Sequence, residues 1–256
     1  MRKLVLLISV FVLVVASCDV KLLRYLGSSS AEGITVKRYD RVLGRYLTTA
    51  DFSALQEMNT TYPRETRVLI EDMLKLGSVA DSGINRRLLE FYRDTTLQNV
   101  IFAAESEFAD LSDIDRELNE AFKVLPKQIP NLRIPNFYAQ IGAFDQSIVV
   151  SDNDVGISLD KYLGANYPAY SRFYDKQMRS SMKREFIVPD CLVFYLWSLY
   201  APRNMHALTQ NERDMVIAKF MWVADYATKK HVFDSPFTAK VSAYMRQHPQ
   251  TTLLDL

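Results

Sequence analysis

The residues of this chain with side chains suited to metal chemistry are few and far apart. The three histidines are His206, His231 and His248. A zinc site on a helix needs two imidazoles one turn apart on one face, together with a third ligand. No two of these histidines are three to five residues apart, so none forms a chelating pair. We expect no metal ion and no cofactor, and we place the histidines at the surface.

Spaced carboxylates are the second group with chemical potential. Asp152, Asp154 and Asp160 resemble the acids of a calcium loop. An EF-hand loop also needs glycine at its sixth position and glutamate at its twelfth. Here Gly156 comes one place early and the twelfth position is Leu163. We therefore interpret the segment "SDNDVG" as a turn between two strands.

Nucleophilic catalysis finds little support. The chain has no G-x-S-x-G motif and no glycine-rich phosphate loop. Cys191 lies in an apolar run, where a lone cysteine usually acts as a small core residue. The stretch "YLGANYPAYSRFY" (162–174) is rich in aromatic residues, and Tyr167, Tyr170 and Tyr174 recur at helical spacing. Such a stripe favours a core position over a ligand groove, although the groove stays open as an alternative.

The first eighteen residues predict the compartment. Arg2 and Lys3 precede an apolar run over 4–16, which as a helix would rise only about 20 Å, short of the roughly 30 Å of a hydrocarbon core. This pattern predicts a secretory signal peptide over 1–17 rather than an uncleaved anchor. "VASC" also resembles a bacterial lipobox, which implies cleavage before Cys18 and lipid on its thiol. Residues 18–33, with their Ser/Gly stretch, are interpreted as a tether.

Composition and charge favour a globular body without a nucleic-acid partner. Hydrophobic residues make up 48% of the chain, enough for a core. There are 31 basic and 30 acidic residues, and removing the signal peptide leaves a net charge of about −1. No block of like charge stands out, which argues against nucleic acid. No segment after residue 18 is long and apolar enough to cross a bilayer.

The periodicity predicts a mostly helical α+β fold. Helical stripes occur over 63–77, 97–108 and 112–125, the last with Ser112 and Asp115 at capping-box spacing. Residues 127–160 instead predict a small antiparallel sheet of about three strands. Helices return beyond residue 160, and Thr209 with Glu212 forms a second capping box that opens a long helix. We expect one domain over 34–256.

The stretch "IVPDCLVFYLW" (187–197) predicts a central helix. Proline suits its first turn, and Asp190 suits the positive end of the helix dipole. The apolar residues after it are expected to be buried all round the helix. These residues are Leu192, Val193, Phe194, Leu196 and Trp197.

Several segments together resemble the GldB-type gliding-motility lipoproteins of Bacteroidota. They are "LDKYLG" (159–164), the tyrosine-proline stretch after it, "REFIVPD" (184–190), and upstream "KRYD", "YPRETRVLIEDMLKLG" and "DIDRELNEAFK". The resemblance covers nearly all of the chain after the signal peptide and carries no catalytic signature. It also implies a distant likeness to zincin metallopeptidases. If Asp190 stood for their catalytic glutamate, the two zinc ligands would fall at Pro189 and Val193, which cannot bind a metal.

Three hypotheses follow. In the first, the chain is a non-catalytic lipoprotein on a degenerate zincin-like scaffold, anchored to an envelope membrane by lipid on Cys18 and acting through protein partners in motility or secretion. In the second, it is a divergent hydrolase that uses carboxylates such as Asp160, Glu185 and Asp190. In the third, it binds envelope glycans through the aromatic stretch. The candidate surface or groove residues are Asp160, Tyr162, Tyr170 and Asp190.

Overall fold

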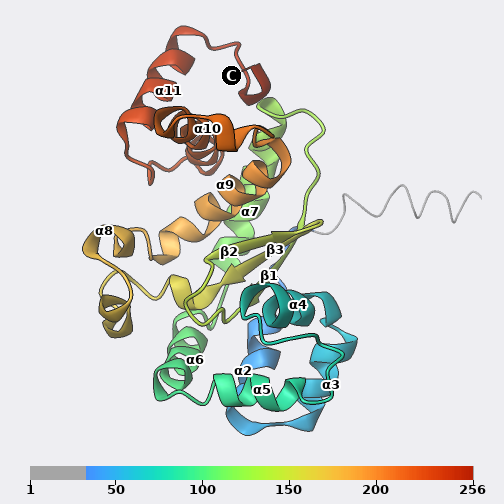
Figure 1. Cartoon of the computed structure of the whole chain (residues 1–256). Coiled ribbons are helices and arrows are strands. Elements are labelled where there is room, and N and C mark those ends of the chain that lie inside the picture. Colours follow the sequence, from blue (N-terminus) through green and yellow to red (C-terminus); the bar gives the residue numbers. More distant parts are fainter. Residues whose placement is uncertain (1–32, 256) are drawn as a thin grey trace, which may run out of the picture. The chain divides into compact units, whose positions relative to one another are not determined.

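The computed structural model describes residues 33–255 of the chain (Figure 1). From Thr35 onward the chain forms one compact unit. The predicted signal peptide and Cys18 lie outside the described residues. Within the described part, no helix combines the length and hydropathy needed to cross a membrane.

Helices make up most of the described chain, which confirms the mostly helical α+β prediction. The α-helices are α2 (Tyr39–Thr49), α3 (Phe52–Thr60), α4 (Pro63–Arg67), α5 (Ile84–Phe91), α6 (Thr95–Glu107), α7 (Ser112–Val124), α8 (Lys176–Arg179), α9 (Ile187–Tyr200), α10 (Gln210–Thr228) and α11 (Pro236–Gln247). A π-helical segment, η1 (Val68–Met73), continues α4. The short 3₁₀ helices are η2 (Leu125–Lys127), η3 (Leu159–Lys161), η4 (Pro168–Arg172), η5 (Arg184–Phe186), η6 (Met205–Ala207) and η7 (Leu253–Asp255).

Of the two predicted capping boxes, one forms and the other does not. Thr209 and Glu212 form the predicted capping box at the start of α10. The box predicted at Ser112 does not form. Leu111 is the N-cap of α7, and Ser112 instead donates its backbone N–H to Asp110 at 2.8 Å. Helix α7 therefore begins one residue earlier than a Ser112 cap would give.

The sheet is mixed rather than antiparallel, which corrects one part of the prediction. Its strand order is β1 (Asn136–Gln140), β3 (Asp154–Ser158), β2 (Ile148–Ser151). β2 and β3 pair antiparallel as expected, but β1 pairs parallel to β3. The registers place the end of β1 and the start of β2 at the same end of β3. Residues 141–147 must therefore pass over that end of β3, and they carry the chain to its far side.

The β2–β3 turn confirms the interpretation of the acidic segment. Asp152 adopts a positive φ of 51°, a conformation that aspartate tolerates better than most residues. Gly156 lies opposite Tyr138 on one neighbouring strand and Val149 on the other. A Cβ atom at Gly156 would come within 2.5 Å of the Tyr138 ring and 2.7 Å of Val149. Glycine is thus required here by packing across the sheet, not by metal binding.

Helix α9 is the centre of the fold, as Figure 1 shows, but one side of it is open. It packs against α10, α7 and the strands β2 and β3. Leu192, Val193 and Leu196 are buried as predicted. Phe194 is 42% exposed and Trp197 is only partly buried, so the expectation of burial all round the helix is wrong. The exposed side of α9 is where the candidate site lies.

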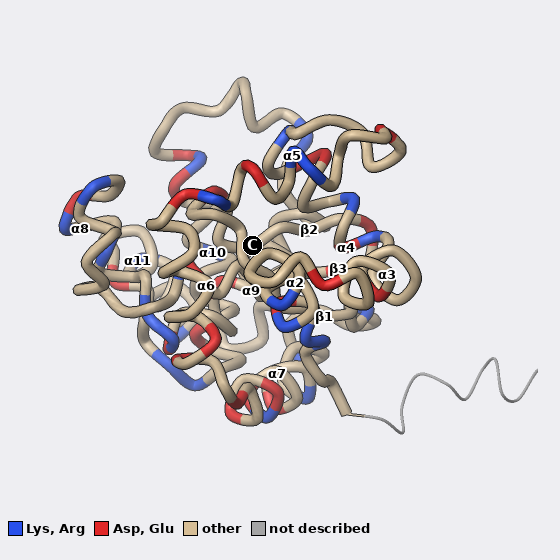
Figure 2. Tube along the Cα trace, turned by 90° about the horizontal axis from the view of Figure 1, so that it is seen from below, with Lys and Arg blue, Asp and Glu red and all other residues tan. Residues whose placement is uncertain are grey.

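Charged residues are interspersed along the described chain. Figure 2 shows basic and acidic positions alternating over most elements, without one sign covering a whole side. Many of them pair locally, for example Lys123 with Glu120 at 2.7 Å and Arg87 with Asp81 at 2.5 Å. Exposed pairs of this kind contribute little to the free energy of unfolding.

Candidate functional site

Asp190 and Tyr162 form a hydrogen-bonded pair at the start of α9. Tyr162 follows η3 and is 1% exposed, and its hydroxyl donates to the Asp190 carboxylate at 2.8 Å. Burial raises the pKa of Asp190 to about 7, and the hydrogen bond from Tyr162 opposes this rise. Burial likewise raises the pKa of Tyr162 well above its ordinary value. Asp190 has no ion pair among the described residues, and its carboxyl keeps some access to solvent.

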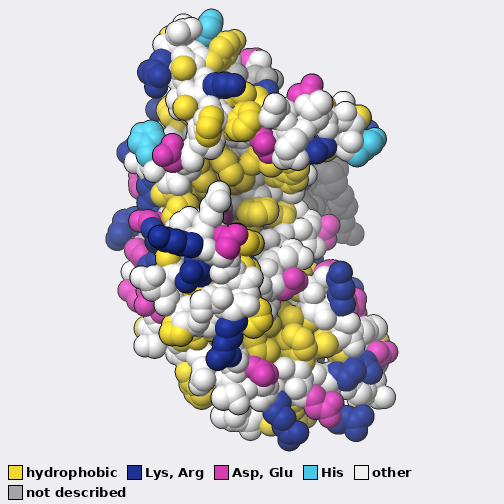
Figure 3. Space-filling view, turned by 60° about the vertical axis from the view of Figure 1, so that its left-hand side comes forward, with side chains coloured by type: hydrophobic (Ala, Val, Ile, Leu, Met, Phe, Trp, Pro, Cys, Tyr) yellow, Lys and Arg dark blue, Asp and Glu magenta, His cyan; other side chains and the backbone are white. Residues whose placement is uncertain are grey.

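Asp190 lines a largely apolar groove, called here the α9 groove, with a volume of about 720 Å³. Its lining residues are Ser147, Gln177, Ser180, Ser181, Phe186, Asp190, Val193, Phe194, Trp197, Ile217, Met221, Val232, Phe233, Asp234 and Ser235. Hydrophobic side chains gather in a hollow on the face seen in Figure 3. The ring of Trp197 packs edge-on against that of Phe220, with centroids 5.9 Å apart. The ring of Phe186 packs edge-on against that of Phe233, with centroids 6.1 Å apart. These ring contacts fix the shape of the groove.

Asp160 is not part of this groove. It has no exposed surface, and its carboxylate accepts hydrogen bonds of 2.6 Å from the backbone N–H groups of Gly142 and Phe144. Both donors belong to the segment that carries the chain over the end of β3. Burial raises the pKa of Asp160, and the two backbone donors oppose that rise. The structure therefore assigns Asp160 to holding the strand crossover and not to a surface.

Tyr170 is also internal, which corrects its placement as a groove residue. It is completely buried, donates its hydroxyl proton to the carbonyl of Asp160 at 2.6 Å, and accepts the N–H of Leu163 at 2.9 Å. Its ring packs edge-on against Phe144, with centroids 5.6 Å apart. The preference for a core position in the aromatic stretch is thus confirmed at Tyr170.

Motifs that carried the family resemblance meet at the end of α6. Arg38 of "KRYD" donates to the carbonyl of Phe108 at 2.9 Å. Arg184 of "REFIVPD" donates to the carbonyl of Glu107 at 3.0 Å and forms a two-pronged pair with Asp113 of "DIDRELNEAFK" at 2.7 and 2.9 Å. These arginines satisfy carbonyls that the last turn of a helix leaves unpaired. The motifs therefore serve the architecture at this point.

The described residues contain no group of three or more His, Cys, Asp or Glu side chains arranged to hold a metal ion. Pro189 and Val193, the positions that a zincin pattern would give to zinc ligands, are both buried in α9. Cys191 is completely buried, and burial raises the pKa of its thiol well above the ordinary value. A protonated, inaccessible thiol is a poor nucleophile. Of the candidate carboxylates, Asp190 alone combines a perturbed pKa with a position in the α9 groove.

Of the residues that line the α9 groove, only Asp190 is proposed as a groove residue from the sequence. Ile217 and Met221 of α10 and Phe233 of the loop before α11 face Phe194 and Trp197 across the groove. The four-residue spacing of Ile217 and Met221 is a helical stripe that was available as a signal. The stripe alone indicates burial against a neighbour and does not distinguish a sealed contact from an open one.

The comparison with known families identifies the class of protein. The model of the family described as gliding motility protein GldB matches residues 27–219, which is most of the chain. The chain belongs to this family of gliding motility lipoproteins. No curated protein and no solved structure matches the chain. The expected likeness to zincins therefore stays a prediction.

Proposed function

We propose that this chain is a lipid-anchored component of the cell envelope that acts by binding another protein of the motility or secretion machinery in its α9 groove. The observation that carries the proposal is the open apolar side of the central helix. Two large apolar side chains of α9, Phe194 and Trp197, line this groove, whereas Leu192 and Leu196 of the same helix are packed in the core.

The exposure pattern of α9 supports a contact surface. Phe194, which is 42% exposed, is joined in the groove lining by Trp197, Ile217 and Met221. Clustered apolar exposure on a folded protein usually marks a site of interaction. Full burial of a large apolar side chain contributes roughly 1.5–3 kcal/mol, so a few such contacts account for a useful affinity. An apolar helix face of a partner has the dimensions and chemistry for this groove.

Crosslinking from within the groove tests this role. A photoactivatable phenylalanine analogue at Phe194, in the full chain expressed in its own cells, should give one dominant crosslinked protein. The same analogue at Phe52, which is 75% exposed on α3, is the matched control and should give none of that product. Trp197→Ala should reduce the Phe194 product at least fivefold. If the crosslinked products were the same at Phe194 and Phe52, the proposal that the partner binds in the α9 groove would be wrong.

The lipid anchor is tested separately at Cys18. The "VASC" sequence supports lipid attachment there, and two or three acyl chains anchor a protein stably. Cys18→Ala should abolish incorporation of a labelled fatty acid and move the protein from the membrane fraction to the soluble one. Cys191→Ala, which alters the second cysteine of the chain, should leave the label unchanged. Retention of label in Cys18→Ala would refute this anchor.

Asp190 supports a second candidate function, that of a hydrolase. A carboxyl group with a pKa near 7 in a groove is suited to general acid or base catalysis. Purified protein should then cleave peptides, and Asp190→Asn should abolish cleavage while leaving the Phe194 crosslink in place. Absence of peptide cleavage, together with a specific crosslink, selects the binding role.

A further inference from the structure

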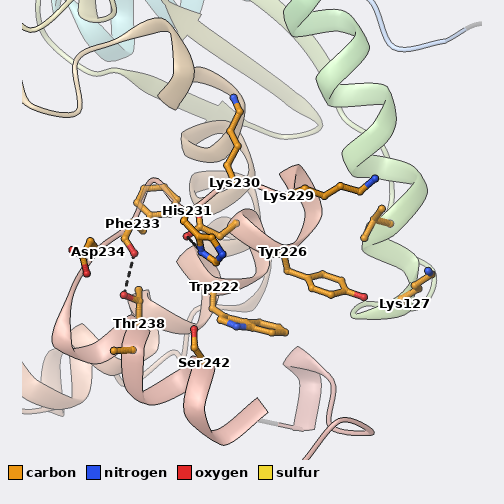
Figure 4. A pocket seen from close by; sticks show the side chains of 13 residues that line it. Lys127, Trp222, Tyr226, Lys229, Lys230, His231, Phe233, Asp234, Thr238 and Ser242 are labelled. Atoms are coloured by element: carbon orange, nitrogen blue, oxygen red, sulfur yellow. Dashed lines mark hydrogen bonds and ion pairs between the residues drawn. The ribbon is translucent and has the colours of Figure 1, made fainter. Parts of the chain in front are cut away.

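A second cavity lies between the C-terminal end of α10 and α11, and it shares Phe233 and Asp234 with the α9 groove. Its volume is about 800 Å³, and α7, η2, α10, the following loop and α11 all contribute to its walls. Figure 4 shows Trp222 and Tyr226 side by side in it, with His231 close to Trp222 and Lys127 opposite. A smaller cavity of about 320 Å³ adjoins it and shares Trp222, Tyr226, His231 and Ser242 with it. We call the two together the α10–α11 pocket.

The aromatic wall of this pocket is a stacked pair. The rings of Trp222 and Tyr226 lie 5.4 Å apart, centroid to centroid, and are tilted by only 17°. Trp222 also packs against the buried cluster of Ala218, Val241 and Met245, so Tyr226 provides the open ring surface of the pair. Tyr226 is 39% exposed, so this pair is not sealed in the core. A flat, partly open ring surface suits a ligand that has a flat apolar face of its own.

The pocket also has a surplus of cations. Four permanently charged cations line it, Lys127, Lys229, Lys230 and Arg246, against two carboxylates, Asp225 and Asp234. The ammonium of Lys230 pairs with Glu117 at 2.7 Å. The pKa of Glu120, outside the pocket, is lowered by its hydrogen bond with Lys123 and also by the charge of Lys229. Lys127, Lys229 and Arg246 form no hydrogen bond or ion pair with the described residues.

The helix dipole explains part of this charge and not the rest. A cation just beyond the last turn of α10 stabilises the negative end of the helix, which accounts for Lys229, its C-cap, and Lys230 after it. Lys127 belongs to η2 and Arg246 to α11, so neither serves the end of α10. His231, with its side chain 98% exposed, adds a hydrogen-bonding ring beside the aromatic pair. Cations from three separate parts of the chain thus line the α10–α11 pocket.

We propose that the α10–α11 pocket binds an acidic polysaccharide, with a sugar ring against the Trp222–Tyr226 pair and its carboxylates on Lys127, Lys229 and Arg246. Hydroxyl groups of the sugar would bond to Ser242, Asp234 and His231, which offer both donors and acceptors. Most of these residues lie after position 219, beyond the part that the family model matches. The pocket shares Phe233 and Asp234 with the α9 groove, but its aromatic pair and its cations lie outside that groove, so variants of those residues test this proposal apart from the partner-binding one.

Two features favour a glycan over a nucleic acid. A phosphate backbone is usually bound by strings of positive charge, whereas this pocket contains two carboxylates among its cations. A hydroxyl-rich ligand needs acceptors as well as donors, and the carboxylates supply them. We therefore keep the hypothesis that aromatic residues bind a glycan, but we place the binding site at α10 and not at Tyr162–Tyr174.

Tryptophan fluorescence gives a direct readout. The chain has two tryptophans, Trp197 in the α9 groove and Trp222 in the α10–α11 pocket. In the full chain carrying Trp197→Phe, kept in detergent micelles, all tryptophan signal comes from Trp222. Polygalacturonate is the probe. Fully methyl-esterified polygalacturonate controls for charge, and polyglutamate, a polyanion without sugar rings, controls for the aromatic contact. We expect saturable binding of polygalacturonate, with both controls at least tenfold weaker.

Matched variants separate the pocket from general effects. Tyr226→Ala should weaken binding at least tenfold. Tyr244→Ala is its control, because Tyr244 is 45% exposed and stacks on His248 at 4.2 Å but lines neither cavity. Removal of two cations with Lys127→Gln and Lys229→Gln should weaken binding at least tenfold.

The charge control for that double variant is Lys176→Gln with Lys240→Gln, which removes two exposed cations from outside the pocket and should leave binding unchanged. Far-UV circular dichroism confirms that each variant folds. Polyglutamate binding as tightly as polygalacturonate, equal loss in Tyr226→Ala and Tyr244→Ala, or no saturable binding would each overturn the proposal.

Discussion

The hydroxyl of Tyr162 donates a 2.8 Å hydrogen bond to the carboxylate of Asp190, and this bond joins the turn after β3 to the first turn of α9. It places a carboxyl group without an ion pair at the wall of an apolar groove. The tyrosine partly offsets the burial that raises the pKa of this group to about 7. The protonation of Asp190 is therefore linked to the stability of the fold near neutral pH.

Asp190→Asn should change how stability depends on pH. Below pH 3.8 the carboxyl is protonated in both folded and unfolded chains, so it contributes no difference. Between 3.8 and about 7 the unfolded chain ionises while the folded chain keeps its proton, so the free energy of unfolding falls as pH rises. Each pH unit between the unfolded and folded pKa corresponds to about 1.4 kcal/mol, reduced here by partial solvent access. Relative to the wild type, Asp190→Asn should gain about 2 kcal/mol between pH 4 and pH 8, measured by urea unfolding.

A control for this titration is Tyr162→Phe. It removes the donor that lowers the pKa of Asp190, so the midpoint of the Asp190 carboxyl, followed by carbon-13 NMR, should move upward. If the stability difference between Asp190→Asn and the wild type is the same at pH 4 and pH 8, Asp190 ionises freely in the folded protein and the linkage is wrong.

Asp160→Ala should destabilise the fold by about 3 kcal/mol or more, because it leaves two buried backbone donors without an acceptor. The donors are the N–H groups of Gly142 and Phe144. Asp160→Asn should cost less, since one amide oxygen still accepts. Asp145→Ala, in the same loop but exposed, is the control and should change the urea midpoint little. Equal effects of Asp145→Ala and Asp160→Ala would contradict the role given to Asp160.

Gly156→Ala should cost about 1–3 kcal/mol through overpacking against Tyr138 and Val149. Shortening the facing side chain with Tyr138→Leu in the same chain should recover part of the loss, because the nearest atoms are those of the tyrosine ring end. Gly83→Ala is the control, with no foreign atom nearer than 3.8 Å to its Cβ. Thermal unfolding checks all three. A loss at Gly83 as large as that at Gly156 would count against a steric cause.

Arg184→Lys should destabilise the protein by about 1–3 kcal/mol, although the charge is kept. Lysine cannot reproduce the two-pronged contact with Asp113 together with the contacts to the carbonyls of Glu107 and Asp110. Arg86→Lys is the matched control, since Arg86 pairs with Glu90 at 3.8 Å on an exposed helix face. Chemical denaturation should show a negligible effect there. Indistinguishable variants would mean that Arg184 acts only as a surface charge.

Local patterns predicted the helices well because a helix that covers a core repeats its apolar residues at a fixed period. Val100, Ile101 and Ala104 of α6 are buried as their spacing indicated. The pairing of β1 was not predictable in this way. The apolar residues of a strand indicate that it is buried. They do not indicate which neighbouring strand it pairs with, or whether that pairing is parallel or antiparallel. That choice depends on Asp160, which acts on residues 16 and 18 positions earlier in the chain.

The candidate site was predicted in part. Asp190 follows from its place in α9, but the exposure of Phe194 depends on how far α10 and the loop before α11 cover the helix. From the sequence, Asp160 is a candidate as a carboxylate that a hydrolase could use, and Tyr170 as an aromatic residue that could bind a glycan, yet both are buried. Here backbone donors and acceptors replace water, and a sequence does not show which backbone groups are free to do so.

The order of strands has a consequence for how the chain is made and exported. β3 lies between two strands that both precede it in the sequence, so the outer strands emerge from the ribosome or the translocation channel before the strand that joins them. Until Asp160 has emerged as well, its carboxylate cannot accept the hydrogen bonds that hold the crossover segment. Both outer strands meanwhile have unpaired edges. Delivery past residue 160 is thus the step after which both outer strands can pair with β3 and their inner edges are no longer open to aggregation.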